Sequence, residues 1–174
     1  MKNETSEMWK GVFMLITSTA FKEGAWIPEK YTARGEDISP ALHLEGIPAG
    51  TKALMITLDD ASHPLFPNYN HWIIWNIPVC SDIPESIPKG EAVAALSGAV
   101  QGMAYGRHCY KGPKPPFKAI HNYTFTVFAL SDFMDLPAAS VKKDVLKQAE
   151  GLILGKAALT GKFQSHRKSQ DNID

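Results

Sequence analysis

Titratable and polar side chains gather in three short segments that lie far apart in the sequence. Asp59 and Asp60 end one apolar run, His71 begins another, and His121 and Tyr123 begin a third. Each group therefore lies at the end of a predicted strand, where the loops of a rigid scaffold meet and where binding residues are concentrated. We expect these side chains to converge on one site.

Two imidazoles, a phenol and a carboxylate together suit a small oxyanion such as phosphate. Imidazole N–H and phenol O–H groups donate hydrogen bonds to the oxyanion. A carboxylate beside a histidine accepts a bond from one ring nitrogen, which fixes the tautomer and favours the cationic ring, so that the other nitrogen donates to the ligand. We therefore predict a small anion pocket containing Asp59, Asp60, His71, His121 and Tyr123.

A proline-rich loop, GRHCYKGPKPPF at residues 106–117, adds a stiff wall to this predicted pocket. We include Tyr110 and Pro113 among the ligand-binding residues, although Tyr110 fits either the pocket mouth or a packing role. Lys111 and Lys114 either raise the local potential for anions or point into solvent.

Other chemistries find less support in the sequence. A metal site of His63 and His71 with Asp59 or Asp60 is a rival, but no HxH or HExxH spacing supports it. The G-x-S-x-G elbow, the P-loop and the G-x-G-x-x-G motif are absent. We therefore expect a protein that is not an enzyme, with no catalytic residue, no metal and no cofactor. Two alternatives stay open: a weak hydrolase of esters or phosphoesters with His71 or His121 as general base, and an interaction protein whose proline-rich loop is the working surface.

The elements that must position these residues read as strands. Prolines and glycines interrupt the chain about every ten residues as far as Pro137, which is typical of a β-sandwich or barrel. Strands are predicted at residues 12–18, 53–58, 72–77 and 123–130. When the last of these strands is taken from residue 121 to residue 130, the two-residue period places His121 and Tyr123 on one face. A turn at residues 36–39 is predicted to brace the site.

One helix is predicted near the end of the chain. Ser140 is placed to cap it, Val145, Ala149 and Leu152 recur at helical spacing, and Gly161 is the predicted stop. We expect one domain at residues 12–164, with a mobile N-terminal arm at 1–11 and a polar C-terminal tail at 165–174.

The bulk composition narrows the class of protein. The 174 residues suit one domain with an adequate core. Eighteen basic and eighteen acidic residues give no net charge, which argues against nucleic-acid binding and against a polybasic membrane anchor. No apolar run reaches the length of a signal-peptide core or a membrane span. We expect a cytoplasmic protein with free thiols at Cys80 and Cys109. Homodimerisation is compatible with this composition.

Four blocks of sequence carry a family resemblance. Residues 18–32, the segment GEDISPAL at 35–42, the segment HWIIWNIP at 71–78, and GPKPP at 112–116 followed by HNY at 121–123 resemble the signature blocks of the phosphatidylethanolamine-binding protein family. They are most similar to its bacterial and archaeal branch, the Raf-kinase-inhibitor-like proteins. The resemblance runs in order from about residue 13 to residue 163.

This resemblance implies a mainly β fold, an antiparallel two-sheet β-sandwich with Greek-key connections and a C-terminal α-helix. It also implies an anion pocket for phosphate, carboxylate or phosphorylated head groups, and regulation of a kinase or protease partner. His71, His121 and Tyr123 match the family's pocket residues. The family pattern Asp-Pro-Asp-Ala-Pro fits Asp60 as the second acid, and Asp59 supplies the first only with one residue deleted.

Overall fold

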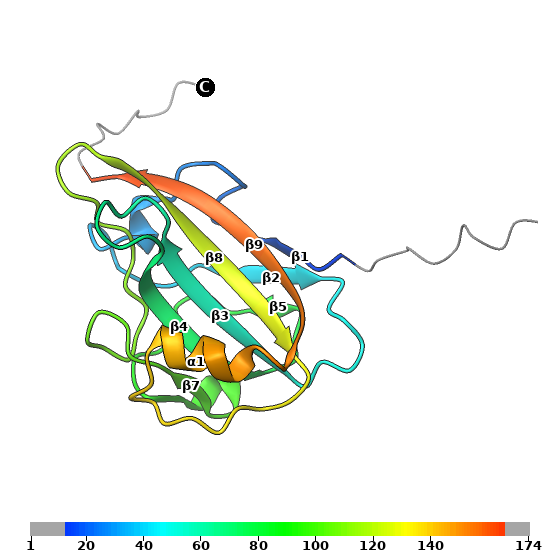
Figure 1. The fold of residues 1–174 in the computed structure, drawn as a ribbon. Helices are drawn as coiled ribbons and strands as arrows, with labels where there is room; N and C mark the ends of the chain where they lie inside the picture. The colour runs from blue at the N-terminus through cyan, green and yellow to red at the C-terminus, as the bar shows by residue number, and fades with distance from the viewer. Residues whose placement is uncertain (1–12, 166–174) are drawn as a thin grey trace, which may run out of the picture.

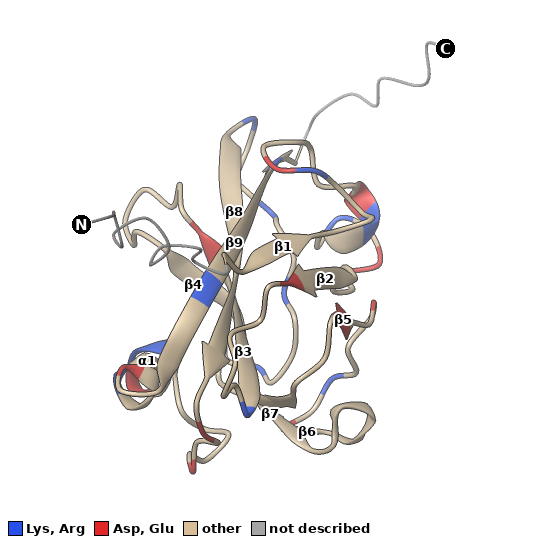
Figure 2. Ribbon diagram, turned by 90° about the vertical axis from the view of Figure 1, so that its right-hand side faces the viewer, with Lys and Arg blue, Asp and Glu red and all other residues tan. Residues whose placement is uncertain are grey.

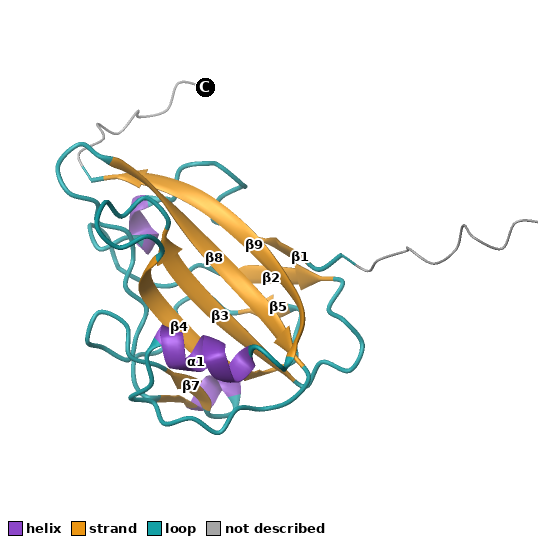
Figure 3. Cartoon of the chain, in the orientation of Figure 1, coloured by secondary structure: helices purple, strands orange, loops and turns teal. Residues whose placement is uncertain are grey.

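The computed structural model describes residues 13–165 and has two antiparallel sheets packed face to face, with one helix on the outer face of the larger sheet (Figures 1 and 3). The smaller sheet has the order β1-β2-β5, with strands β1 (Leu15–Thr17), β2 (Leu42–Glu45) and β5 (Asp82–Ile83). The larger has the order β6-β7-β4-β3-β8-β9, with strands β6 (Ala92–Val93), β7 (Ala99–Gln101), β4 (Tyr69–Pro78), β3 (Ala53–Asp60), β8 (Ile120–Leu130) and β9 (Ile153–Gln164). The helix is α1 (Lys142–Ala149), and short 3-10 turns occupy Glu29–Tyr31 and Ala94–Leu96. The predicted mainly β sandwich with one helix is confirmed.

The large sheet is buried on both faces, which explains why its central strand is apolar throughout. All eight residues of β3 are buried. Leu54, Ile56 and Leu58 pack between the two sheets, whereas Met55 packs toward α1. The same alternation separates Trp72, in the core between the sheets, from Trp75, in the core beneath the helix. A strand with core on both sides has no polar face, as β3 shows.

The register of the central strands places the end of β3 beside the starts of β4 and β8, at one end of the sheet. Asp60, at the end of β3, lies opposite Tyr69 of β4 on one side and Tyr123 of β8 on the other. Along β8 the odd-numbered residues from His121 to Ala129 are buried toward the smaller sheet, as the two-residue period predicts. The strand pairing therefore places Asp60 and Tyr123, two of the predicted site residues, directly opposite each other.

The helix is shorter than predicted, and the chain after it is a strand. Helix α1 ends at Ala149, and from Ile153 onward β9 pairs with β8 over eleven register positions. The extension of the helix to Gly161 is therefore wrong, and pairing with β8 has outweighed a helical pattern already weakened by Gly151 and Gly155. Ser140 is not the cap, because the N-cap position is Val141, which has no side-chain capping bond.

Gly161 has a packing role instead of a capping role. A Cβ at this position would lie 2.5 Å from Cγ1 of Ile27 and 2.7 Å from Cε2 of Phe21. The absence of a side chain at Gly161 thus lets Phe21 and Ile27 pack directly on β9.

Several further expectations concern the chain as a whole. Cys80 and Cys109 are both free, as predicted. The predicted arm at residues 1–11 lies outside the described residues, as does the predicted tail apart from Ser165. No helix within residues 13–165 is long and apolar enough to cross a bilayer. Acidic and basic residues are interspersed over loops and strand ends (Figure 2).

Candidate functional site

Three aromatic rings from two strands form a cluster at this end of the sheet, and Tyr123 contacts both of the others. The ring centroid of Tyr123 lies 5.3 Å from that of His71, with the planes nearly perpendicular at 85°. The ring centroid of Tyr123 also lies 6.3 Å from that of His121, with an angle of 28° between the planes. His121 and Tyr123 are alternate residues of β8, and His71 lies near the start of β4. Side chains that are 50 residues apart in the sequence therefore form one cluster.

Asp60 holds the ring of His121. Its Oδ2 is 2.7 Å from Nδ1 of His121, and its Oδ1 accepts the backbone N–H of Ser62 at 2.9 Å. Both side chains are more than nine-tenths buried. An ionised carboxylate only accepts hydrogen bonds, so the proton in this contact belongs to Nδ1. A ligand would therefore meet His121 at Nε2.

His71 is held through the same ring nitrogen by a different partner. Its Nδ1 donates to the backbone carbonyl of Lys111 at 3.0 Å. Burial lowers the pKa of His71, and the carbonyls of Lys111 and Gly112 and the negative charge of Asp60 oppose that effect only in part. The ring is therefore neutral near pH 7, with a lone pair on Nε2. It accepts a bond from a protonated ligand, and it donates to an anion only after taking up a proton.

Tyr123 supplies a hydroxyl that stays protonated. Burial is the main cause that raises the pKa of Tyr123, the negative charge of Asp60 adds to it, and the backbone N–H of Lys114 opposes it. The pKa lies far above physiological pH, so the phenol remains an O–H donor. The cluster thus contains one permanent donor in contact with two imidazoles.

An aromatic wall extends from the cluster toward solvent, and the sequence reasoning missed it. The ring of Tyr105 lies 4.8 Å from His71 and 5.0 Å from Tyr69, and Tyr105 is 47% exposed. The ring of His63 stacks on Tyr69 at 5.1 Å. Tyr69 was within reach of sequence reasoning, because it is two residues before His71 and shares its strand face. Tyr105 comes from a loop turn at φ 52°, which no local pattern marks.

The loop that carries the Lys111 carbonyl is fixed by Asp37. Oδ1 of Asp37 accepts the Gly112 backbone N–H at 2.7 Å, and Oδ2 accepts Nζ of Lys111 at 2.7 Å. Gly112 has no room for a side chain, because a Cβ there would lie 2.7 Å from the Cα of Thr32. The turn lies at residues 33–36 and not at the predicted 36–39, and Asp37, just after it, braces this loop together with Lys111.

Asp59 does not join the cluster. It follows Leu58 and precedes Asp60 on one strand, so its side chain points to the opposite face. There its Oδ1 lies 2.8 Å from Nζ of Lys142 on α1, and its Oδ2 accepts the hydroxyl of Thr57 at 3.0 Å. In the family pattern one residue separates the two acids, which puts both on the same face. Here they are adjacent, so we leave Asp59 out of the proposed site.

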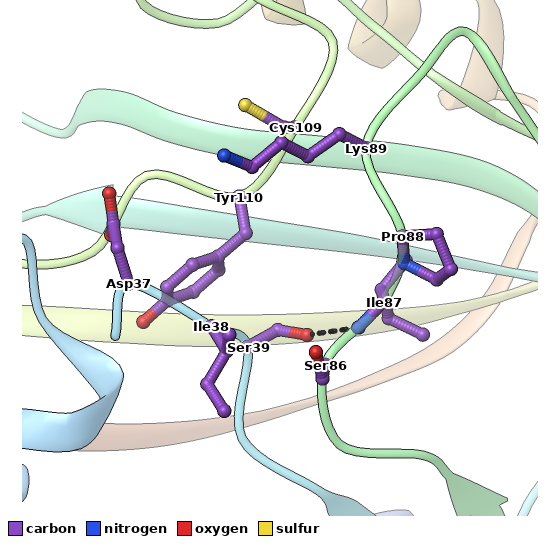
Figure 4. A pocket seen from close by; sticks show the side chains of 9 residues that line it. All are labelled: Asp37, Ile38, Ser39, Ser86, Ile87, Pro88, Lys89, Cys109 and Tyr110. Atoms are coloured by element: carbon purple, nitrogen blue, oxygen red, sulfur yellow. Dashed lines mark hydrogen bonds between the residues drawn. The ribbon is translucent and has the colours of Figure 1, made fainter. Parts of the chain in front are cut away.

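Tyr110 also lies apart from the cluster and packs in the core. Its hydroxyl donates to the carbonyl of Tyr31 at 2.6 Å, and its ring contacts Trp72 and Phe125. It lines a small neighbouring pocket of about 110 Å³, together with Asp37 and Ser39 (Figure 4). Of the two roles that the sequence allowed for Tyr110, the structure has the packing role.

Pro113 lies in the braced loop, and the rival metal site is not assembled. Pro113 is buried, and its carbonyl accepts the N–H of Ala33 at 3.1 Å. Lys114 is exposed. Nδ1 of His63 accepts the N–H of Phe66 at 3.0 Å. Within residues 13–165, no group of three His, Cys, Asp or Glu side chains is placed to hold a metal ion.

Comparison with known proteins assigns the domain. The family profile described as phosphatidylethanolamine-binding protein matches residues 17–164. A UPF0098 protein of Pyrococcus abyssi is 37% identical over 156 residues, which cover 88% of this chain and 87% of the relative. A UPF0098 protein of Methanothermobacter thermautotrophicus is 38% identical over 153 residues, which cover 87% of this chain and 99% of the relative.

Two solved structures share the fold. A putative phosphatidylethanolamine-binding protein homologue from Chlamydia trachomatis has a TM-score of 0.75 and 31% identity, and the match covers 87% of this chain and 97% of that one. The E. coli protein YbcL, described as a new member of the mammalian PEBP family, has a TM-score of 0.79 and 25% identity, with 86% and 97% covered. By its profile match and these relatives, this chain belongs to the phosphatidylethanolamine-binding protein family.

Proposed function

We propose that this chain is a non-enzymatic binding protein that holds a small oxyanion against His71, Tyr123 and His121. Family membership supports a binding function, and the contact of Tyr123 with both imidazole rings is the observation that carries the finer proposal. Both imidazoles are held through Nδ1 by groups of the protein, so a ligand at their Nε2 atoms would meet fixed rings. The ligand class is phosphate, a carboxylate or a phosphorylated head group.

The charges at the cluster favour a ligand that brings or takes up a proton. Asp60 supplies a buried negative charge, and burial keeps His71 neutral near pH 7. An anion at Nε2 of His71 needs a proton on that nitrogen, or a proton of its own to share. We therefore expect affinity to fall as the pH rises, and we expect monoanions to bind better than dianions.

Calorimetric titration tests the proposal directly. Phosphate, phosphoethanolamine and acetate would be titrated at several pH values, in buffers of different ionisation enthalpy that report proton uptake. Tyr123→Phe and His121→Ala should each weaken phosphate binding by about tenfold or more, the value of one charge-assisted bond. His43→Ala is the matched control, because His43 also pairs with an aspartate, Asp82, but lies exposed. Equal heats in the wild type and His121→Ala would reject the site.

A phosphorylated residue of a partner kinase or protease is the extended form of this ligand class. Competition distinguishes it from the free anion, because a phosphopeptide that uses the same site should be displaced by phosphate from the wild type. Retention of the phosphopeptide by Tyr123→Phe with unchanged affinity would show that it binds elsewhere.

One observation favours a second candidate, a weak hydrolase. A neutral His71 with a lone pair on Nε2 has the protonation state that a general base requires. A screen with chromogenic esters and phosphoesters separates the two candidates. Turnover by the wild type that disappears in His71→Asn, with folding intact, would replace the binding proposal with the enzymatic one.

A further inference from the structure

Tyr105 has a backbone conformation that a tyrosine rarely adopts. Ala104 N–H donates to Arg107 O at 3.1 Å, and Arg107 N–H donates to Ala104 O at 2.9 Å. These bonds close a two-residue turn whose central residues, Tyr105 and Gly106, have φ values of 52° and 65°. Such turns favour asparagine or aspartate followed by glycine, and a bulky side chain in the left-handed region is an outlier. Because backbone strain of this kind is concentrated at functional sites, it points to a function for the Tyr105 ring.

The turn places the Tyr105 ring against the cluster. Its centroid lies 4.8 Å from that of His71 and 5.0 Å from that of Tyr69, and both pairs of rings meet edge to face. Burial is the largest cause that raises the pKa of Tyr105, and the neighbouring Tyr69 and the negative charge of Asp60 add to it. The Tyr105 phenol therefore lies within electrostatic reach of the carboxylate that holds His121.

The aromatic side chains become more exposed with distance from the cluster. His71 is 3% exposed, Tyr105 is 47% exposed and Phe66 is 58% exposed. The ring of Phe66 lies 6.1 Å from that of Tyr69 and 5.5 Å from that of His63. The rings thus run without a break from a buried end to an open end. An oxyanion at the buried end would leave the rest of its molecule beside the exposed rings.

The charges on the surrounding loops favour a neutral organic group over a cationic one. Arg107 closes the Tyr105 turn, and Lys114 lies three residues beyond the Lys111 carbonyl that holds His71. Both cations are exposed, and neither forms an ion pair with any residue from 13 to 165. They attract an anion and repel an ammonium group. Among neutral groups, an aromatic ring gains most from other rings, because aromatic pairs contribute beyond the area that they bury.

We propose that the cluster binds the oxyanion of an aryl phosphate, and that Tyr105, Tyr69 and Phe66 pack against the aryl ring. This inference rests on the proposed function, because the cluster must hold the oxyanion for the aryl ring to lie beside these side chains. The exposed rings then determine which phosphate esters are preferred, and Tyr105 is the residue that joins them to the cluster.

Calorimetric titration with matched phosphate monoesters tests the proposal. Phenyl phosphate and cyclohexyl phosphate have rings of the same size, but only the first is aromatic, so the comparison separates the aromatic contact from apolar burial. At about pH 5 both esters are mainly monoanions, because the second pKa of a phosphate monoester is about 6. The wild-type protein should bind phenyl phosphate about threefold to tenfold more tightly than cyclohexyl phosphate. Equal affinities for the two esters would overturn the proposal.

The variant Tyr105→Asn tests the ring that the proposal assigns. Asparagine suits the left-handed position of this turn, so the variant should fold, and the midpoint of urea denaturation checks this. The ratio of the two affinities should fall to about one. Phe117→Asn is the matched control, because Phe117 also has a positive φ, 53°, is 83% exposed and contacts no aromatic ring within residues 13–165. The control should keep the wild-type ratio, and a preference that survives in Tyr105→Asn would reject the role of Tyr105.

Two further ligands separate the ways in which the proposal can fail. If the wild type does not bind inorganic phosphate, the proposed function is rejected and this inference falls with it. If it binds phosphate without preferring phenyl phosphate, only the aryl ligand is rejected. Tighter binding of phosphocholine than of phenyl phosphate would show that the exposed rings recognise a cation, and it would also overturn the proposal.

Aryl phosphates occur as free small molecules and as phosphotyrosine side chains, and a phosphotyrosine peptide distinguishes these sources. Equal affinity for the peptide and for phenyl phosphate would identify the aryl phosphate group alone as the ligand. Tighter binding of the peptide would identify a protein source. Either result supports the proposal if the affinity falls in Tyr105→Asn, and unchanged affinity for both ligands in that variant would reject it.

Discussion

Asp37 is the residue whose replacement should most sharply test the account of the braced loop. Its carboxylate accepts the Gly112 N–H and the Lys111 ammonium, each at 2.7 Å, and its backbone has a φ of 57°. Asp37→Ala removes both acceptors and places an alanine in the left-handed region. Asp37→Asn keeps an acceptor for Gly112 and keeps a residue type that tolerates this conformation.

The two variants should differ by about 3 kcal/mol in the free energy of unfolding. In Asp37→Ala the buried Gly112 N–H loses its partner, at a cost of about 2 kcal/mol. The partly buried ion pair with Lys111 contributes about 1 kcal/mol, and the left-handed backbone costs alanine about 1 kcal/mol. Only the ion pair is lost in Asp37→Asn, so that variant should lose about 1 kcal/mol and Asp37→Ala about 4 kcal/mol.

Urea denaturation of both variants at pH 7 measures these differences, and phosphate titration of the folded proteins adds a functional readout. Release of the loop moves the Lys111 carbonyl that holds Nδ1 of His71, so Asp37→Ala should also bind phosphate more weakly than Asp37→Asn. If the two variants lose the same stability and bind phosphate equally, the brace described here is refuted.

Two further predictions concern buried charge. Because burial lowers the pKa of His71, the unfolded chain binds more protons than the folded one below about pH 6.5. The free energy of unfolding should therefore fall as the pH drops through that value, and this slope should be reduced in His71→Gln; identical slopes in the two proteins would contradict it. Lys142→Met leaves the carboxylate of Asp59 largely buried without its cation, since the side chains are 23% and 10% exposed. It should cost about 2 kcal/mol in chemical denaturation, whereas the double variant with Asp59→Asn should recover most of the loss, and no recovery would refute the pairing.

The sandwich could be predicted from sequence because its main strands carry strong local signals. The apolar runs that became β3, β4 and β8 are rich in β-branched and aromatic residues, and their two-residue period fixed which side chains share a face. The last part of the chain could not be predicted in this way. Val145, Ala149 and Leu152 do recur at helical spacing, but Ile153 and the residues after it pair with β8, and that pairing is a tertiary interaction invisible in the local pattern.

The cluster was predictable for a related reason. His71, His121 and Tyr123 lie at strand ends, and antiparallel pairing with β3 brings such ends together. Tyr105 was not predictable, because its position depends on the course of a long loop. The packing of Tyr110 follows from the same kind of long-range geometry, since its hydroxyl meets the backbone of Tyr31 in a segment 79 positions away.

The adjacency of Asp59 and Asp60 has a consequence for how relatives are aligned to this chain. A gap of one position at this strand end does more than shorten the chain. It moves the first carboxylate from the face of the sheet that carries the rings to the face that carries α1. Inserting one residue between the two acids should place both on the face that carries the rings, and it should leave the ammonium of Lys142 without its partner. A single gap here therefore separates relatives with both carboxylates on one face of the sheet from relatives with one on each face, a difference that a percentage of identity does not report.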